Sequence, residues 1–309
     1  MAISSYPQIG CHTAAGRLRN HNEDACGLPV RGADLARFGT LLIVADGVGG
    51  MPGGAQASQH AVRDLQTLFY AGSGPSEAAD RLRYCVESIN ALNRLHPEKS
   101  DQIDGYLTTL VAAVIAGDEI WIANVGDSRA YLIQSLKSRR VQLTEDHSRE
   151  TRMAKRGLTG DQAGLPHQGV ITRAIGLEDH CQVDTYHYTW SPGDRLVLCS
   201  DGLAQLAEQE MINLTVGQPA PLAAKRLVDR AIEVDGSDNC TAVVAVWDVS
   251  DPVQPEASVE SSAHSNRVTS TGRDLHPLVL LSIGLLLGWL SAVLITLFWL
   301  DAASILDVF

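Results

Sequence analysis

Residues 41–54 read LLIVADGVGGMPGG, an apolar run that ends in Asp46 and continues into glycines. An apolar strand followed by a carboxylate and a glycine-rich turn presents that carboxylate at the end of the strand. Three kinds of site are compatible with this arrangement: a dinucleotide cradle, a phosphate-binding loop and a metal site. The spacing of the glycines and the other acidic residues of the chain distinguish them.

Both nucleotide-binding alternatives fail on spacing. A dinucleotide fingerprint requires G-x-G-x-x-G, and after Gly47 and Gly49 the third glycine position holds Pro52. A Walker loop requires Gly-Lys-Ser or Gly-Lys-Thr at its end, and neither tripeptide occurs in the sequence. A metal site is the remaining interpretation.

Other carboxylates occupy positions similar to that of Asp46. They are Asp201 after the apolar run LVLCS, Asp238 before the run CTAVVAVW, Asp127 in NVGDSRAYL, and Glu23 and Asp24 in GRLRNHNEDA. A single Asp-Gly is typical of a turn. Several carboxylates gathered at strand boundaries would repel one another unless a divalent cation compensated their charge. Oxygen ligands of this kind indicate Mg²⁺ or Mn²⁺ instead of zinc.

The composition agrees with a cation-binding globular protein. The 309 residues carry a formal net charge of -12, which argues against a nucleic-acid partner because such proteins normally present a basic face. The six cysteines form no CxxC pair, so neither a zinc site nor a compact disulfide scaffold is expected. Reduced, mostly buried thiols are predicted.

Seven ordered segments resemble the metal-dependent serine/threonine protein phosphatases of the PP2C family, in their short bacterial form. They are RLRNHNED (17–24), ADGVGG (45–50), VGDSRAYL (125–132), LTEDHS (143–148), ITRAIG (171–176), LCSDGL (198–203) and SDNCTAVV (237–244). The resemblance covers about residues 8–248 and implies an α+β fold, a four-layer α/β/β/α sandwich of two antiparallel sheets flanked by helices. It also implies hydrolysis of phosphoserine and phosphothreonine in proteins by a water that bridges two Mn²⁺ or Mg²⁺ ions.

The resemblance assigns metal-binding roles to the carboxylates. Asp46 is expected to bridge both ions, and the carbonyl of Gly47 to complete one coordination shell. Asp201 and Asp238 are expected to bind the other ion. In the same way, Glu23 and Asp24 are expected to act through metal-bound waters.

The remaining roles concern the phosphate and the leaving group. Arg19 matches the phosphate-binding arginine and is expected to act with Asp46 in catalysis, since its planar fork can hold two oxygens. Arg17 is the fallback candidate. A third, weaker metal site at Asp127 and Ser128 is left open. Eukaryotic members of the family often place a proton-donating histidine where this chain has Val48, and bacterial members commonly lack it, so the general acid has no assigned residue.

The segment Asp146–Gly169 matches the flap of the family. His147, at its start, is the second candidate for the general acid after a metal-bound water, although a packing role is more typical of such a histidine. Lys155 and Arg156 could contact substrate, but a solvated charge run is the more usual interpretation. We expect Arg129 to form an internal salt bridge.

Apolar and β-branched runs predict the elements that position these residues. Strands are expected at 40–46, 108–117, 119–133, 181–190, 194–201 and 240–249, with a tight hairpin at Gly117 and Asp118. Spacings of three and four predict helices at 54–71 and 220–234, and a third is expected at 76–95. Strands in runs with helices in blocks indicate sheet packed on sheet.

The C-terminal part differs in composition from the body. A phosphatase domain is predicted for residues 1–248 and a flexible linker rich in Ser, Thr and Pro for 249–277. Residues 278–300 contain no charge and would form a helix of about 34 Å, long enough to span a bilayer. Residues 301–309 would form a short non-cytoplasmic tail.

Orientation follows from the charges that flank the span. Arg267 and Arg273 precede it and no Lys or Arg follows it, so the domain should be cytoplasmic at the inner membrane. The sequence thus predicts a single-pass phosphatase that opposes a Ser/Thr kinase at the membrane, with the lipid bilayer as a further partner. The alternative is a catalytically weak or silent, membrane-tethered regulator that binds phosphoproteins.

Overall fold

The computed structural model describes residues 6–48, 53–72, 74–95, 106–157 and 170–247. All of them belong to one compact unit, Met1–Val253. The predicted linker, membrane span and tail (249–277, 278–300 and 301–309) lie outside the described residues. Among the residues described, no helix combines the length and apolar character that crossing a bilayer requires.

Two five-stranded antiparallel sheets form the centre of this unit. The first has the order β1 (Gln8–Ala14), β10 (Cys240–Val246), β9 (Arg195–Cys199), β6 (Arg129–Gln134) and β7 (Arg139–Gln142). The second has the order β2 (Asp24–Gly27), β3 (Thr40–Asp46), β4 (Leu110–Ala116), β5 (Glu119–Val125) and β8 (Asp184–Thr189). β1 and β2 are therefore edge strands of different sheets.

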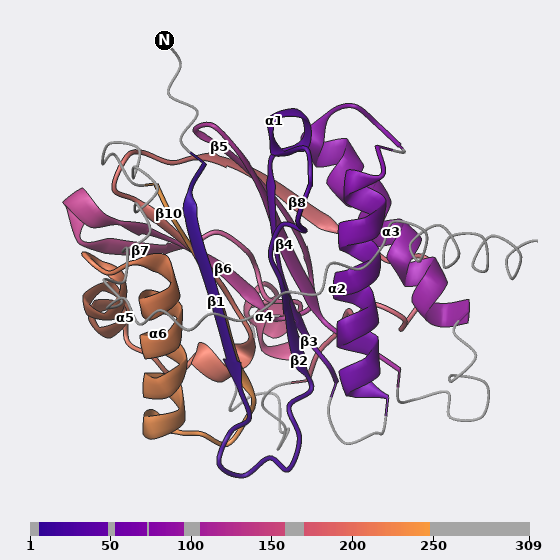
Figure 1. Ribbon diagram of the computed structural model, residues 1–309. Coiled ribbons are helices and arrows are strands. Elements are labelled where there is room, and N and C mark those ends of the chain that lie inside the picture. Colours follow the sequence, from indigo (N-terminus) through magenta and orange to yellow (C-terminus); the bar gives the residue numbers. More distant parts are fainter. Residues whose placement is uncertain (1–5, 49–52, 73, 96–105, 158–169, 248–309) are drawn as a thin grey trace, which may run out of the picture. The chain divides into compact units, whose positions relative to one another are not determined.

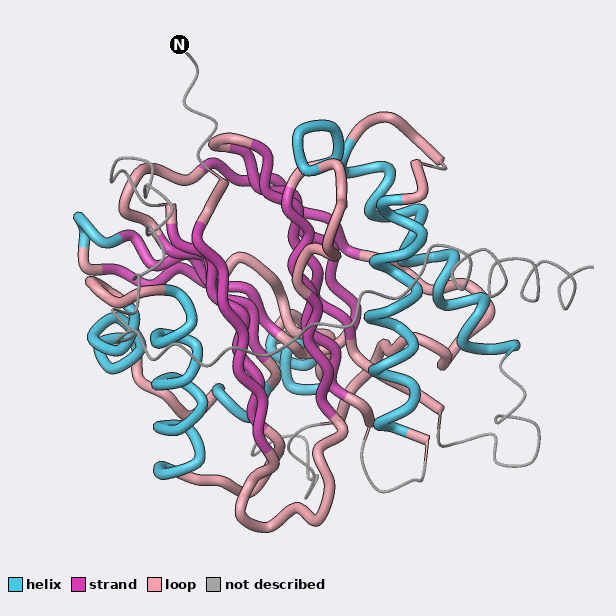
Figure 2. The backbone as a smooth tube through the Cα atoms, in the orientation of Figure 1, coloured by secondary structure: helices cyan, strands magenta, loops and turns pink. Residues whose placement is uncertain are grey.

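Helices cover the outer face of each sheet (Figures 1 and 2). α2 (Gly54–Tyr70) and α3 (Ala78–Leu95) pack on the second sheet, whereas α5 (Glu208–Thr215) and α6 (Ala220–Val234) pack on the first. The short helices α1 (Leu35–Phe38) and α4 (Arg149–Ala154) lie in connections. This arrangement confirms the predicted sandwich of two antiparallel sheets flanked by helices.

Alternation along the strands divides the apolar residues among three core layers. Ile43 of β3 packs with Leu65 of α2 on the outer side, while its neighbour Val44 joins the inner layer between the sheets together with Leu198 of β9. Successive side chains of a strand point to opposite faces, so a strand covered on both sides must be apolar throughout. For this reason the central strands are continuous hydrophobic runs.

Most predicted elements are confirmed. β3 occupies the predicted residues 40–46, α2, α3 and α6 match the three predicted helices, and the β4–β5 hairpin turns at Gly117, whose φ is 64°. The single strand predicted at 119–133 is wrong, because it is two strands, β5 and β6, that belong to different sheets. Gly126 separates them with φ at 109°, a conformation that L side chains rarely adopt.

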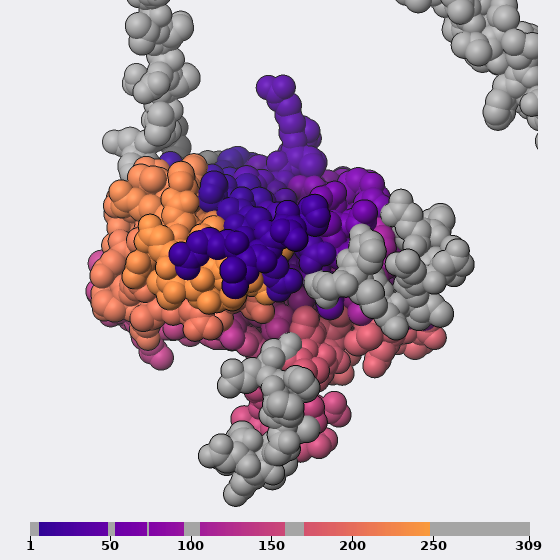
Figure 3. All heavy atoms as spheres, turned by 90° about the horizontal axis from the view of Figure 1, so that it is seen from below, coloured from indigo at the N-terminus to yellow at the C-terminus, as the bar shows by residue number. Residues whose placement is uncertain are grey.

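The register brings six loops or strand ends to one end of the sandwich. Asp24 of β2 pairs with Asp46 of β3, and Ala14 at the end of β1 pairs with Cys240 at the start of β10. Figure 3 shows this end, where the indigo N-terminal residues lie beside the orange residues that precede and form β10. Segments separated by more than 200 residues of sequence are thereby neighbours.

Candidate active site

Carboxylates from five separate segments meet at this end of the sandwich. Asp46 ends β3, Asp24 begins β2, and Asp201 opens the short 3₁₀ helix after β9. Asp238 precedes β10, and Asp127 lies between β5 and β6. Asp24 and Asp201 lie close enough to Asp46 for their charges to raise its pKa. Like charges held this close repel one another, so the group resists full ionisation.

The electrostatics of the cluster show the same resistance. Burial, with a smaller contribution from the charge of Asp201, raises the pKa of Asp24 to about 6 and that of Asp127 to about 7. Burial, followed by repulsion from Asp24, raises the pKa of Asp46 well above its ordinary value. The pKa of Asp201 is raised by burial and by Asp238. These carboxylates are held together at the expense of their charged forms.

The donor set fits a divalent cation. Asp24 Oδ1 and Asp201 Oδ1 are both buried and have no hydrogen-bond partner. Buried oxygens of this kind are costly unless a cation or a donor satisfies them. Within the described residues, no three Asp, Glu, His or Cys side chains are already placed to hold one ion between them. The fit therefore rests on the chemistry of the oxygens and on their mutual repulsion.

Hydrogen bonds from the two threonines just before β4 fix the backbone that carries Asp46. The N–H of Asp46 donates to Thr109 Oγ1 at 3.0 Å, and the N–H of Thr109 donates to the Asp46 carbonyl at 2.8 Å. The hydroxyl of Thr108 donates to the same carbonyl at 2.9 Å. Next along the chain, a Cβ on Gly47 would lie 2.3 Å from the carbonyl oxygen of Gly54, so only glycine fits there.

Arg19 lies against the carboxylate cluster. Its Nη2 is 2.7 Å from Asp238 Oδ2, and its side chain remains 36% exposed, which leaves guanidinium surface for another anion. Arg17, the fallback candidate, instead donates to the carbonyl of Asp235 at 2.9 Å. The structure thus places Arg19, and not Arg17, beside the predicted metal ligands.

Asn239 is a supporting residue that the sequence analysis missed. Its Oδ1 accepts the N–H of Glu23 at 2.9 Å, and its Nδ2 donates to the carbonyl of His21 at 2.9 Å. One side chain therefore joins the segment 21–23 to the start of β10. The signal was an asparagine directly after Asp238, since Asn side chains commonly bond to backbone groups.

Two hydroxyl groups that were also missed orient Asp24. Ser200 Oγ and Thr241 Oγ1 donate to Asp24 Oδ2 at 2.7 and 2.6 Å. Thr241 belongs to the first sheet and Ser200 directly follows β9 of that sheet, while Asp24 belongs to the second, so these bonds connect the two sheets at the site. Neither hydroxyl has a distinctive sequence signal, because each becomes significant only through a contact across the sandwich.

The loop between β5 and β6 also contacts the site. Asp127 is 7% exposed, and Ser128 Oγ lies 2.7 Å from Thr109 Oγ1, the group that holds Asp46. Arg129 forms a bidentate salt bridge with Asp146, in which Nη2 lies 2.6 Å from Oδ2 and Nε lies 3.0 Å from Oδ1. The predicted internal salt bridge of Arg129 is confirmed.

Comparison with known proteins agrees with this geometry. The sequence profile described as protein phosphatase 2C matches residues 16–232. The chain belongs to the protein phosphatase 2C family. It is 33% identical over 244 residues to the serine/threonine phosphatase stp of Listeria monocytogenes, covering 77% of this chain and 94% of that protein.

Solved structures of PP2C-type enzymes have the same fold. The serine/threonine phosphatase of S. agalactiae superposes with a TM-score of 0.70 at 30% identity, covering 79% of this chain and 100% of the other. The catalytic domain of the serine/threonine protein phosphatase PstP, in complex with two manganese ions, has a TM-score of 0.64 at 27% identity and covers 78% and 97%. Manganese is thus found in a structure of this PP2C fold.

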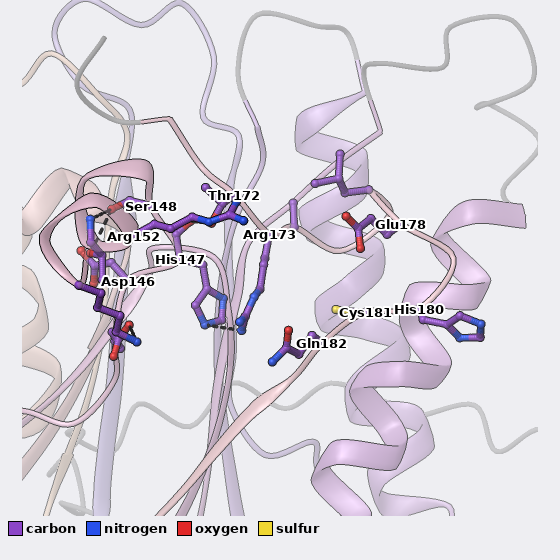
Figure 4. A pocket seen from close by; sticks show the side chains of 15 residues that line it. Asp146, His147, Ser148, Arg152, Thr172, Arg173, Glu178, His180, Cys181 and Gln182 are labelled. Atoms are coloured by element: carbon purple, nitrogen blue, oxygen red, sulfur yellow. Dashed lines mark hydrogen bonds and ion pairs between the residues drawn. The ribbon is translucent and has the colours of Figure 1, made fainter. Parts of the chain in front are cut away.

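Beside the PP2C site, the residues at the base of the predicted flap line a pocket of about 400 Å³ (Figure 4). His147 points into it toward Arg173, and its Nδ1 accepts the N–H of Gly126 at 3.0 Å. Because Nδ1 accepts, Nε2 carries the hydrogen and donates to Asp184 Oδ2 at 3.1 Å. Burial lowers the pKa of His147. The ring thus supports the Gly126 turn, in agreement with a packing role, and its part as a general acid stays a prediction.

The predicted flap is described as far as residue 157. Lys155 forms an ion pair with Glu145, so its charge is used within the chain. Residues 158–169 lie outside the described part. The assignments of individual PP2C site residues stay predictions, and what the structure adds is that they meet at one place.

Proposed function

We propose that this PP2C enzyme hydrolyses phosphoserine and phosphothreonine in proteins with the help of bound Mn²⁺ or Mg²⁺. The observation that carries the proposal is the cluster of buried carboxylates, two of whose oxygens have no partner, beside the exposed guanidinium of Arg19. The serine/threonine phosphatases named above are relatives over most of their length, and this supports the same reaction here.

The residues of the chain suggest how the metal is held. Asp46, Asp201 and Asp238, together with the Gly47 carbonyl, would bind two ions, and Asp24 would act through water. When bound, such ions supply a water of lowered pKa and polarise the phosphate. Burial also raises the pKa of Glu23, the other residue predicted to act through water. Asp127 and Ser128 are the candidates for a third ion.

The chain's own groups perform the other tasks. Arg19 can turn part of its fork toward a phosphate dianion while it remains beside Asp238, because only one of its terminal nitrogens is used in that ion pair. Thr108 and Thr109 keep the Asp46 backbone fixed, so that its carboxylate need not reorganise when substrate binds. Burial of Thr108 and Thr109 strengthens the hydrogen bonds that they form.

The alternative is a silent regulator that only binds phosphoproteins. Such a protein would be expected to lack a ligand carboxylate or the phosphate-binding arginine. Every carboxylate of the predicted set is present, and Arg19 lies beside it. No observation on the described residues favours the silent alternative.

The enzymatic proposal can be tested with the full-length protein in detergent. With Mn²⁺, it should release phosphate from p-nitrophenyl phosphate and from phosphothreonine peptides, and much more slowly from phosphotyrosine peptides. Asp46→Asn should abolish turnover, while Asp194→Asn, a buried aspartate in the turn before β9, should not. Retained turnover in Asp46→Asn would refute the assignment of that ligand, and an inactive wild type would favour the regulator.

We further propose that residues 278–300 anchor the enzyme in the inner membrane with the catalytic domain in the cytoplasm. The support is the uninterrupted apolar sequence and the arginines that precede it. A tether would raise the effective concentration of the enzyme near membrane-bound kinases and their substrates, so a Ser/Thr kinase is the expected antagonist. Protease added to right-side-out vesicles should remove a C-terminal tag, and protection of the tag would refute this orientation.

A further inference from the structure

Two cysteines face each other at the open edge of the sandwich. Cys11 lies in β1 and Cys26 in β2, the edge strands of the two sheets. Cys11 pairs with Val243 and Cys26 pairs with Val44, and both valines belong to the layer between the sheets. Directly paired residues of antiparallel strands point to the same face. Both thiols therefore point into the space between the sheets.

Polar contacts two residues away show that the two cysteines lie at the same height along the neighbouring strands β1 and β2. Thr13 follows Cys11 by two residues, and its hydroxyl lies 2.7 Å from the hydroxyl of Thr241. The Thr241 hydroxyl in turn donates to Asp24, which precedes Cys26 by two residues. Since residues i and i+2 of a strand share a face, Cys11 and Cys26 occupy the next level of the same stack. In Figure 1, β1 and β2 run beside each other at the near edge of the two sheets.

Cys11 and Cys26 differ from most of the other cysteines in their exposure and in their pKa values. The neighbouring Cys26 lowers the pKa of Cys11 to about 7, whereas burial raises the pKa of Cys181 to about 12. Cys11 and Cys26 are half-buried, and three other cysteines, Cys85, Cys199 and Cys240, are buried. An accessible thiol with a substantial thiolate fraction at neutral pH is the form that reacts with peroxides.

We propose that Cys11 and Cys26 are an oxidisable pair that closes to a disulfide on exposure to a peroxide and thereby lowers the activity of the phosphatase. The Cys11 sulfur attacks one peroxide oxygen, the O–O bond breaks, and the second oxygen leaves as water once protonated. The Cys26 sulfur then attacks the sulfenic sulfur of Cys11, the S–S bond forms, and the sulfenic oxygen leaves as a second water. The two sulfurs supply the two electrons that reduce the peroxide.

The disulfide would act on the site through β2. Its sulfurs must approach to about 2 Å, closer than thiols in contact, so the two edge strands must be drawn together. β2 has only four residues, and it begins at Asp24, whose carboxylate is held by Ser200 and Thr241 of the first sheet. Displacement of the strand would misplace that carboxylate. This consequence for activity rests on the proposed function, whereas formation of the disulfide does not.

The experiment uses the full-length chain in detergent, reduced and freed of metal with EDTA. Hydrogen peroxide is added, removed with catalase, and the protein is divided between a non-reducing tryptic digest and an assay with p-nitrophenyl phosphate and Mn²⁺. Cleavage after Arg17, Arg19 and Arg31 separates the cysteines into peptides 1–17 and 20–31. We expect these peptides joined, lighter than their sum by the two thiol hydrogens, with turnover reduced several-fold and restored by dithiothreitol.

Matched variants distinguish the effect of a Cys11–Cys26 disulfide from the effect of oxidation at other residues. Cys11→Ser and Cys26→Ser should each lose the joined peptides and keep their activity after peroxide. Cys181→Ser, which replaces a half-buried thiol of the pocket in Figure 4, should behave like the wild type.

Three outcomes have distinct meanings. If peroxide leaves peptides 1–17 and 20–31 separate, or joins Cys11 to a different cysteine, the proposal is overturned, and this result needs no variant. If the disulfide forms and turnover is unchanged, its control of the site is refuted. A reduced wild type without turnover would refute the proposed function, and the mass of the joined peptides would still decide whether the pair is oxidised.

Discussion

Replacement of Asp24 by asparagine should stabilise the metal-free protein. The pKa of Asp24 rises from the ordinary 3.8 to about 6 on folding, chiefly through burial. One pKa unit is worth about 1.4 kcal/mol, so ionised Asp24 costs the fold roughly 3 kcal/mol near pH 7. The folded state binds the proton of the Asp24 carboxyl more tightly than the unfolded chain does. The contribution of protonated Asp24 to stability is therefore complete below pH 3.8 and is lost as the pH rises through about 6.

Asparagine should retain the geometry while it removes the charge. Its carbonyl oxygen can accept the bonds that Ser200 and Thr241 now donate to Oδ2. Its amide would occupy the place of Oδ1, which has no hydrogen-bond partner, and could donate to the neighbouring carboxylate of Asp46. The gain at neutral pH should therefore approach roughly 3 kcal/mol and should nearly vanish near pH 4.

Urea denaturation in EDTA, followed by tryptophan fluorescence near neutral pH and near pH 4, measures this difference. Asp194→Asn is the matched control, because Asp194 is also buried but accepts a hydrogen bond from the N–H of Ser191, away from the cluster. This control should lose stability at neutral pH. The reasoning fails if Asp24→Asn is no more stable than the wild type near neutral pH, or if its gain is equally large near pH 4. Saturating Mn²⁺ should reverse the order, since binding to the native state favours the wild type.

Three other substitutions test separate parts of the site. Arg19→Ala should raise KM for a phosphothreonine peptide at least several-fold, and Arg17→Ala should leave it nearly unchanged; equal effects in steady-state assays would contradict the placement of the phosphate. Gly126→Ala should cost several kcal/mol in thermal or urea unfolding, because its Cβ would lie 2.6 Å from another side chain at φ 109°. Gly117→Ala, with φ at 64° and open space, should cost only about 1–2 kcal/mol, and equal losses would refute the steric argument. Asn239→Ala should weaken Mn²⁺ binding, measured by calorimetry, and unchanged affinity would show that its two backbone bonds do not position the ligands.

Local sequence predicted the elements well where burial alone determined the pattern of apolar residues. Residues 40–46 are apolar because β3 is covered on both faces, and the period of α6 reflects one buried side. β1 and β2 were not predicted, since edge strands bury less and carry mixed polar residues. The strand predicted at 119–133 failed because two strands of different sheets follow each other with only the Gly126 turn between them.

The sequence by itself determined which chemistry was available: carboxylates beside strands, an arginine near the first of them, and the ordered segments of the PP2C family. These are local properties, since spacing and turn residues can be read without knowing the partners. Only the tertiary structure decided that Asp24 faces Asp46, that Arg19 and not Arg17 reaches Asp238, and that Cys11 and Cys26 both point into the layer between the sheets. Contacts of that kind depend on the register of strands and on the packing of two sheets. Register is set by the whole buried layer, so no short segment encodes it alone.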